Sequence, residues 1–182
     1  RSAIRYALSA IKSIGRPVIE GIVREREEHG EYTSLKTFVE RNIDQINKRV
    51  VENLIKAGAL DCLEGNRKQK MTIYTQIIDS INQDKKHTMA GQLSLFDIAS
   101  EEDKKEFEIR MPQVEEYPKE IILTFEKEVL GIYLSGHPLE RYRNMMEKMI
   151  SAKTSDFQPD DETGIPEVYD NQKVIVGGMI TD

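Results

Sequence analysis

The sequence of 182 residues contains no tryptophan, a single cysteine and three histidines. The lone Cys62 excludes an internal disulfide framework and any cysteine-rich zinc site. A reducing cytoplasm is therefore the compartment we expect. No apolar run approaches the roughly 18–20 residues of a membrane span, so we expect no membrane partner. The chain starts at Arg1 and no signal-peptide core follows, so we expect a piece of a longer protein.

The usual signatures of an enzyme are also missing. His29, His87 and His137 lie far apart in the sequence, and none is at metal-ligand spacing with another histidine or the cysteine. The sequence has no phosphate-binding Gly-x-x-x-x-Gly-Lys loop and no Gly-x-Ser-x-Gly nucleophile elbow. We interpret Cys62 as a small buried thiol and residues 160–162 as a solvated acidic turn. We therefore expect no catalytic residue, metal or cofactor in this chain.

What the sequence has in abundance is charge, and it is unevenly distributed. Charged residues make up 32% and apolar residues 38%, so there is enough apolar material for a core. Residues 1–86 carry 16 Lys and Arg against 12 Asp and Glu, a net charge of +4, whereas residues 87–182 carry 10 against 20, a net charge of −10. The overall −6 argues mildly against nucleic-acid binding, but the basic half deserves a separate interpretation.

The first half has the apolar period of helices. We expect a first helix over Ile4, Leu8 and Ile11, a second from about Pro17 to Gly30, and a short third that Ser34 caps. A fourth is expected over 46–57 and a fifth from the cap Asn66. The residues expected inward on the last four are Val18, Ile19, Ile22, Val23, Leu35, Phe38, Ile46, Val50, Leu54, Ile55, Met71, Tyr74, Ile77, Ile78 and Ile81.

The second half is less regular. Around residue 84 the period stops, and a helix resumes near Pro118, with Ile122, Phe125, Val129 and Ile132 expected inward and its end at Gly136 and Pro138. We expect a helical stretch over 139–150 with packing by Met145, Met146 and Met149, a loop over 153–167, and a strand over 173–180. A lone strand needs partners, so it looks like the start of a domain that continues elsewhere.

Two helical hairpins are candidate phosphate sites. A short turn between two helices can present backbone N–H groups and a positive helix end to a phosphate without reading a base. The residues concerned are Lys12, Ser13, Ile14, Gly15 and Arg16 in the first hairpin, and Lys56, Gly58, Asn66, Arg67 and Lys68 in the second. Ser13 stands where such a hairpin usually has its first glycine. The alternative is that both are plain helical hairpins with a solvated face.

A further candidate is Gln92-Leu93-Ser94-Leu95-Phe96 in the polar stretch 85–118. Burying Leu95 and Phe96 in a partner would contribute roughly 1.5–3 kcal/mol each before ordering costs. Two apolar anchors, one polar anchor and flexible flanks are typical of a short linear motif. The alternative is that Leu95 and Phe96 fold back on the chain's own helices.

In order along the chain, these features resemble the bacterial DNA polymerase III alpha subunits, the family C DNA polymerases, after the fingers. Residues 4–15 and 47–61 are similar to a tandem helix-hairpin-helix domain, residues 91–96 to the internal sliding-clamp-binding motif, residues 126–139 to the segment that leads into the OB domain, and residues 173–180 to the first OB strand. The fold class so implied is mainly α, with a truncated β start of an OB-fold. The domains are then 1–84 (tandem helix-hairpin-helix), 85–118 (clamp-binding linker), 119–152 (helical connector) and 153–182 (loop and first OB strand).

The resemblance implies a part in DNA replication. The parent protein is a DNA-directed DNA polymerase, a nucleotidyltransferase that uses divalent metal such as Mg²⁺, but its catalytic carboxylates precede this region. The implied partners are double-stranded DNA, the sliding clamp (beta subunit) through Gln92, Leu93, Ser94, Leu95 and Phe96, and other holoenzyme subunits through the parent chain. The alternative is a protein–protein scaffold whose only binding activity is to the clamp and whose hairpins are purely structural. A repair enzyme is disfavoured by the missing catalytic residues, and we interpret His137 as structural.

Overall fold

The first half of the chain folds into helices that pack against one another. The computed structural model describes residues 7–89, 109–161 and 163–180, and the chain divides into two compact units, Arg1–Leu134 and Ser135–Asp182. The described part of the first unit holds η1 (Leu8–Ala10), α1 (Arg16–His29), α2 (Leu35–Asn42), α3 (Lys48–Lys56), α4 (Arg67–Met89) and α7 (Lys119–Leu130). The predicted helical fold of this half is confirmed, although the part of the first predicted helix that is described is the single 3-10 turn η1.

Local sequence signals fix where these helices start. The Ser34 side chain accepts a hydrogen bond from the Thr37 N–H at 3.1 Å, and the Asn47 side chain accepts from the Val50 N–H at 3.0 Å. Each cap satisfies a backbone donor that has no partner within the helix. α1 instead follows Gly15 with a proline in its first turn and ends at Gly30, whose φ of 82° suits glycine.

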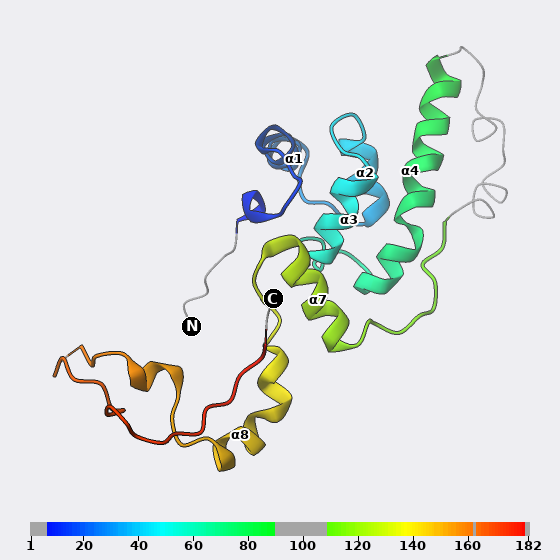
Figure 1. The fold of residues 1–182 in the computed structure, drawn as a ribbon. Coiled ribbons are helices and arrows are strands. Elements are labelled where there is room, and N and C mark those ends of the chain that lie inside the picture. The colour runs from blue at the N-terminus through cyan, green and yellow to red at the C-terminus, as the bar shows by residue number, and fades with distance from the viewer. Residues whose placement is uncertain (1–6, 90–108, 162, 181–182) are drawn as a thin grey trace. The chain divides into compact units, whose positions relative to one another are not determined.

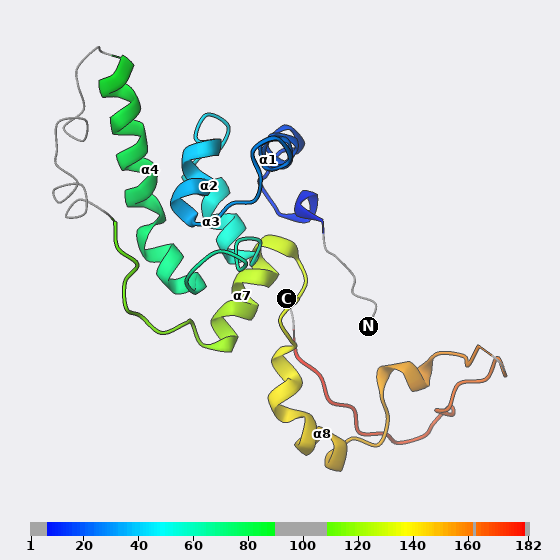
Figure 2. The ribbon, with the colours of Figure 1, turned by 180° about the vertical axis from the view of Figure 1, so that it is seen from behind.

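α3 lies in the core of the first unit. Val51 is fully buried and Ile55 is 1% exposed, because α3 packs against both α4 and α7, which lie next to it in Figures 1 and 2. α2 packs against α4 and α1 packs against α2. Most of the apolar residues expected inward from the sequence are buried or half-buried here, as the 3.6-residue period predicts.

α7 is shorter than the sequence suggested. It ends at Leu130, and Gly131 follows with a φ of 78°, the left-handed conformation that ends many helices. The predicted end at Gly136 and Pro138 is therefore wrong, because Gly131 stops the helix first. Ile132 lies beyond this end and is 38% exposed, so its predicted inward position is wrong too. Leu123, Val129 and Leu130 supply the buried face.

Part of the expected linker lies against α4. α4 continues to Met89, past residue 84 where the apolar period stops. Residues 109–117 are described as an extended segment, with Ile109 and Met111 packed against the core. Its backbone is held by Gln69 of α4 and by Asn66 just before α4, since Gln69 Nε2 donates to the Pro112 carbonyl at 2.7 Å and Asn66 Nδ2 donates to the Val114 carbonyl at 2.9 Å.

The second unit has little buried apolar surface of its own. It holds η2 (Pro138–Tyr142), α8 (Arg143–Met149) and η3 (Thr154–Phe157). Met145 is 53% and Met149 61% exposed, so the packing predicted for these two methionines is wrong. No strand is assigned to residues 173–180, which contact the rest of the unit at several points: the Ser151 N–H donates to the Ile175 carbonyl at 2.9 Å, and Gly177 lies close to the side chains of Met146 and Ile150. The predicted OB strand is not confirmed.

The division after Leu134 falls inside the stretch 119–152, for which we expected one helical connector. α7 belongs to the first unit through its packing on α3, and η2 and α8 belong to the second. Within the described ranges, no helix is both long enough and apolar enough to cross a membrane.

Candidate nucleic-acid interface

The first hairpin is a turn that neighbouring helices hold in place. Ile11 and Ile14 are buried, while Lys12, Ser13 and Gly15 between and beside them are exposed. The Lys12 N–H donates to the Val129 carbonyl of α7 at 2.8 Å, and the Lys12 carbonyl accepts from Asn53 Nδ2 of α3 at 2.8 Å. The turn is therefore fixed to two helices while its outer residues face solvent.

Ser13 adopts the backbone conformation for which glycine is usually required. Its φ is 64°, in the left-handed region that costs an ordinary residue roughly 1–2 kcal/mol. The hydrogen bonds of the Lys12 carbonyl and N–H help to offset this free-energy cost and so to hold the conformation. The replacement of the usual glycine at this position is thus compatible with a hairpin turn.

The start of α1 is open to solvent. Gly15, its N-cap residue, has no side chain to cap the helix, Pro17 has no N–H, and the Val18 N–H bonds back to the Gly15 carbonyl at 3.1 Å. Within the described chain, no group accepts a hydrogen bond from the N–H of Gly15 or Arg16. The Arg16 side chain is 86% exposed and pairs with Glu20 at 3.0 Å, a surface contact that contributes little to stability.

The second hairpin is built around a buried ion-pair network. The Arg67 guanidinium lies 2.7 Å from Asp61 Oδ2 and 3.2 Å from Glu126 Oε1, and it also donates to the Lys56 carbonyl. Arg67 is 6% exposed and Glu126 is fully buried, with its second oxygen accepting from the Leu134 N–H at 2.8 Å. Arg67 therefore joins the hairpin to α7 from the interior.

Gly58 makes room for this network. Its φ of 76° is left-handed, and a Cβ at this position would overlap the Arg67 guanidinium and approach Asp61 Oδ2 at 2.9 Å. The residue that looked like a phosphate-binding glycine is thus required for the close approach of an internal arginine.

The other cations of the second hairpin are also engaged. Lys56 Nζ lies 3.0 Å from a carboxylate oxygen of both Glu52 and Glu128. Burial alone would lower the pKa of Lys56, but the hydrogen bonds to these two carboxylates outweigh it and raise the pKa. Lys70 is 1% exposed and donates to the Gly65 carbonyl, and burial lowers its pKa. Lys68 lies 5.8 Å from the centre of the Tyr117 ring.

A carboxylate of the chain itself occupies the start of α4. Glu116 accepts hydrogen bonds from the N–H groups of Arg67 at 2.9 Å, Lys68 at 3.1 Å and Tyr117 at 2.8 Å. Partial burial would raise the pKa of Glu116, but these backbone donors together lower it. The sequence analysis did not select Glu116, and the only signal was an acidic residue shortly before the predicted helix at Pro118.

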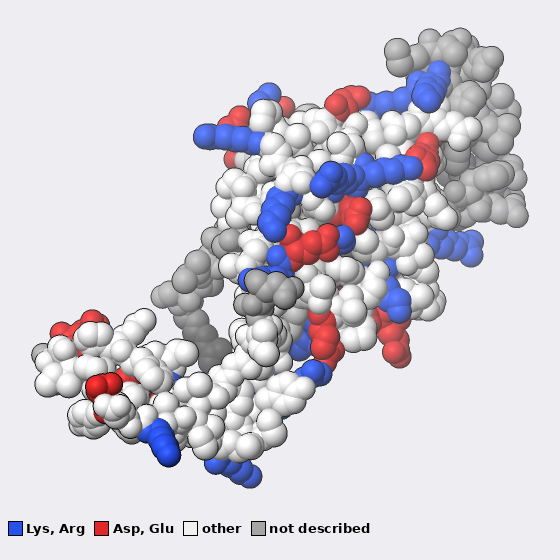
Figure 3. Space-filling view, in the orientation of Figure 1, with Lys and Arg blue, Asp and Glu red and all other residues white. Residues whose placement is uncertain are grey.

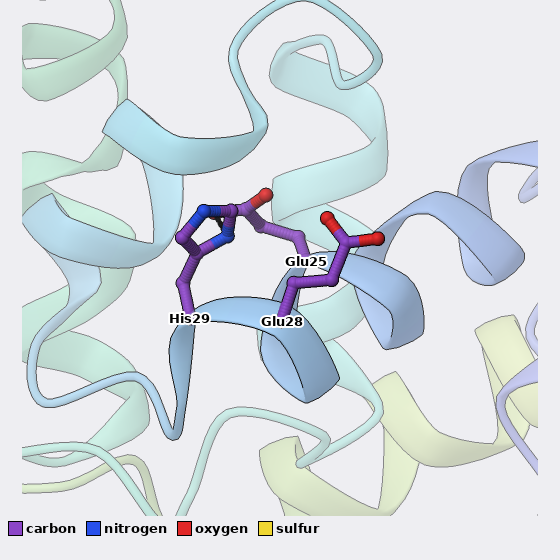
Figure 4. Close-up of side chains that lie close together, drawn as sticks. All are labelled: Glu25, Glu28 and His29. Carbon is purple, nitrogen blue, oxygen red and sulfur yellow. Dashed lines mark ion pairs between the residues drawn. The ribbon is translucent and has the colours of Figure 1, made fainter.

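Charges of both signs lie side by side over the first unit, as the face drawn in Figure 3 shows. One compact group on α1 contains Glu25, Glu28 and His29, whose ligand atoms lie within 4.8 Å of one another (Figure 4). Glu25 already pairs with Arg41 at 2.9 Å and with His29 Nδ1 at 3.1 Å. Arg41 also donates to the carbonyls of Glu25 and Gly30, and its hydrogen bond lowers the pKa of Glu25. This group is an ion-pair cluster that fixes the end of α1.

Three residues that the sequence analysis weighed have simple positions. Cys62 is exposed beside a cavity of about 240 Å³ that Phe38 and Leu60 also line, so the interpretation as a buried thiol is wrong. His137 Nδ1 accepts from the Leu139 N–H at 3.2 Å at the start of η2. Asp160 accepts from the N–H and hydroxyl of Thr163 in a turn. The motif Gln92-Leu93-Ser94-Leu95-Phe96 lies outside the described residues.

Comparisons with known proteins found a matching family and several similar proteins. Residues 1–70 match the family described as a helix-hairpin-helix motif. The chain is 35% identical over 157 residues to the DNA polymerase III subunit alpha of Chlamydia pneumoniae, covering 85% of this chain and 13% of that protein. It is 37% identical over 151 residues to that of Borreliella burgdorferi, covering 82% and 13%. With that of Saccharopolyspora erythraea it shares 31% identity over 191 residues, covering 99% and 15%. The chain thus spans a small fraction of these relatives' length.

Proposed function

The chain belongs to the family of the bacterial DNA polymerase III alpha subunits, of which it spans a small region, and we propose that this region binds duplex DNA and tethers the polymerase to its sliding clamp. The observation that carries the DNA part is the first hairpin, an anchored and solvent-facing turn within the matched helix-hairpin-helix residues. Such a turn suits the phosphate backbone of DNA, whose oxygens are the same in every sequence. This is the kind of contact that a processive polymerase needs, because it must hold DNA without reading the bases.

The whole protein extends a primer during DNA replication, and this region contributes binding rather than chemistry. The carboxylates of Asp61 and Glu126 form ion pairs with Arg67. The nucleotidyl transfer and its divalent metals belong to other parts of the parent subunit. The other holoenzyme subunits bind through that parent chain.

The tether to the clamp is the segment Gln92 to Phe96. Leu95 and Phe96 are its apolar anchors, Gln92 is its polar anchor, and Leu93 and Ser94 support them. A weak motif beside a DNA-bound domain acts at high effective concentration, so modest affinity for the clamp is enough for long residence on DNA.

A test of the tether is calorimetric titration of a purified bacterial sliding clamp with this chain. We expect micromolar or tighter binding, lost in a Leu95→Ala/Phe96→Ala double variant. A chain that fails to bind the clamp, or a double variant that binds as well as the parent, would refute the assignment of this segment. The DNA assignment is tested separately by fluorescence anisotropy with a labelled duplex in rising salt, since phosphate contacts give a steep loss of affinity.

One observation favours a second candidate function, a scaffold that binds only the clamp. The second hairpin has its cations and its helix start satisfied internally, as a purely structural hairpin would. If the chain binds the clamp and shows no salt-dependent affinity for duplex DNA, the scaffold is the correct function.

A further inference from the structure

We infer that the two hairpins are unequal, and that duplex DNA is held by the first hairpin with Lys12, Arg16 and Arg49, while the second hairpin is closed by the chain's own carboxylates. This inference rests on the proposed DNA binding and names the residues responsible for it. It also adds Arg49, which the sequence analysis did not select. Four observations carry it.

First, the helix start of the second hairpin has no donor left for a phosphate. The N–H groups of Arg67 and Lys68 donate to Glu116, and that of Gln69 donates to the Asn66 side chain at 2.8 Å. The next N–H, of Lys70, bonds to the Asn66 carbonyl at 3.1 Å within the helix. A phosphate contacts a helix start through these same donors, so the site is already filled.

Second, the basic residues of the second hairpin are not available as free charge. Arg67 and Lys70 are buried, and Lys56 lies between two carboxylates with its side chain 12% exposed. Lys68 is half-buried, and of these four cations it alone is neither buried nor in an ion pair with a described residue. Five carboxylates surround these four cations, those of Glu52, Asp61, Glu116, Glu126 and Glu128. The most basic stretch of the sequence is therefore close to neutral in the folded protein.

Third, the first hairpin has the opposite character. No carboxylate caps α1, and the turn is held by backbone and amide contacts that leave its outer face to solvent. Lys12 is exposed and forms no ion pair with any other described residue, and the one pair of Arg16, with Glu20, is exposed on both sides. Exposed cations of this kind exchange their counterions for phosphates at little cost.

Fourth, Arg49 belongs to α3, the helix that contacts this turn, although it is distant from the turn in sequence. Two contacts join the first hairpin to the chain around α3: the Lys12 carbonyl meets the Asn53 side chain, and Gly21 packs closely on the Gln45 side chain. Arg49 precedes Asn53 by four residues in α3, so the two residues share one side of the helix. Its side chain is exposed and unpaired in the described structure, so it extends the cationic surface next to the start of α1.

The experiment measures the salt dependence of duplex binding for single variants of equal charge change. A labelled duplex is titrated with the whole chain by fluorescence anisotropy at several salt concentrations. We expect Lys12→Gln and Arg49→Gln each to weaken binding several-fold and to make the slope of log K against log salt shallower by about 0.9, the value for one lost phosphate contact. The matched control Lys68→Gln removes one charge from the second hairpin, and we expect its slope to stay at the parent value.

Each outcome bears on a different statement. If Lys68→Gln changes the slope as much as Lys12→Gln, or if neither Lys12→Gln nor Arg49→Gln changes it, the inequality of the hairpins is refuted while DNA binding stands. If the parent chain shows no salt-dependent binding to the duplex, the proposed DNA binding itself fails. Circular dichroism of each variant checks that the helical fold is retained; Lys12 and Arg49 are exposed, Lys68 is half-buried, and none of the three is a core residue.

Discussion

Replacing Glu116 by glutamine should destabilise the first unit, because one carboxylate satisfies three backbone donors there. Two of these, the N–H groups of Arg67 and Lys68, begin α4, and the third belongs to Tyr117. An amide oxygen can keep one or two of these hydrogen bonds but loses the negative charge that favours a helix start. Loss of a helix cap typically costs about 1 kcal/mol, and hydrogen bonds to a charged group about 1.5–3 kcal/mol. Because Glu116 is largely exposed, we expect the lower part of this range, about 1–2 kcal/mol.

The pH dependence of this loss has a definite sign. The folded structure lowers the pKa of Glu116 below its ordinary 4.5, so the folded state favours the ionised carboxyl. The stabilisation is therefore fully present above the unfolded-state pKa and is lost as the pH falls through the lowered folded-state pKa. The difference between the parent and Glu116→Gln should be largest near neutral pH and should vanish in strong acid.

The assay is urea denaturation followed by helical circular dichroism at several pH values. The control is Glu115→Gln, which removes the same charge from the neighbouring exposed position. We expect the control to change the free energy of unfolding by less than about 0.5 kcal/mol. If Glu115→Gln costs as much as Glu116→Gln at neutral pH, or if the Glu116→Gln effect does not shrink in acid, Glu116 does not cap α4 as argued here.

Two further predictions concern the ion-pair network. Gly58→Ala should lower the free energy of unfolding by about 1–3 kcal/mol, because the new Cβ displaces the Arg67 guanidinium from Asp61. The control is Gly131→Ala, which has a similar φ of 78° and open space around it. It should lose only about 1 kcal/mol, through backbone strain. Thermal unfolding compares the two, and equal losses would contradict the steric role of Gly58. Glu126→Gln should cost about 2–3 kcal/mol, because Arg67 then lies buried beside a neutral partner. Glu128→Gln on the same helix removes a carboxylate that is 55% exposed and leaves Lys56 paired with Glu52, so it should cost at most about 1 kcal/mol in the same denaturation assay. Similar values for the two variants would show that burial is not decisive.

Much of the helical fold could be predicted from local sequence. Ser34 and Asn66 act as the caps that their positions predict, and Gly30 ends α1 as expected. The errors occurred where two signals competed. Gly131 ended α7 before Gly136 could, since the first glycine that can adopt a left-handed conformation is sufficient. Met145 and Met149 have helical spacing, but each is more than half exposed in the second unit, so spacing alone did not place them in a core.

The candidate interface could likewise be predicted only in part from the sequence. The sequence by itself determined the helices, their caps, the two hairpins and the residue types within them, because these depend on neighbours within a few positions along the chain. Only the tertiary structure decided which hairpin is open. Glu116 reaches the start of α4 and Glu126 reaches Arg67 across 48–59 positions of sequence, and α3, which carries Arg49, contacts the first turn through Asn53. Two hairpins of similar composition thus differ because electrostatic pairing depends on distance in space, which the spacing of charges along a sequence does not reveal.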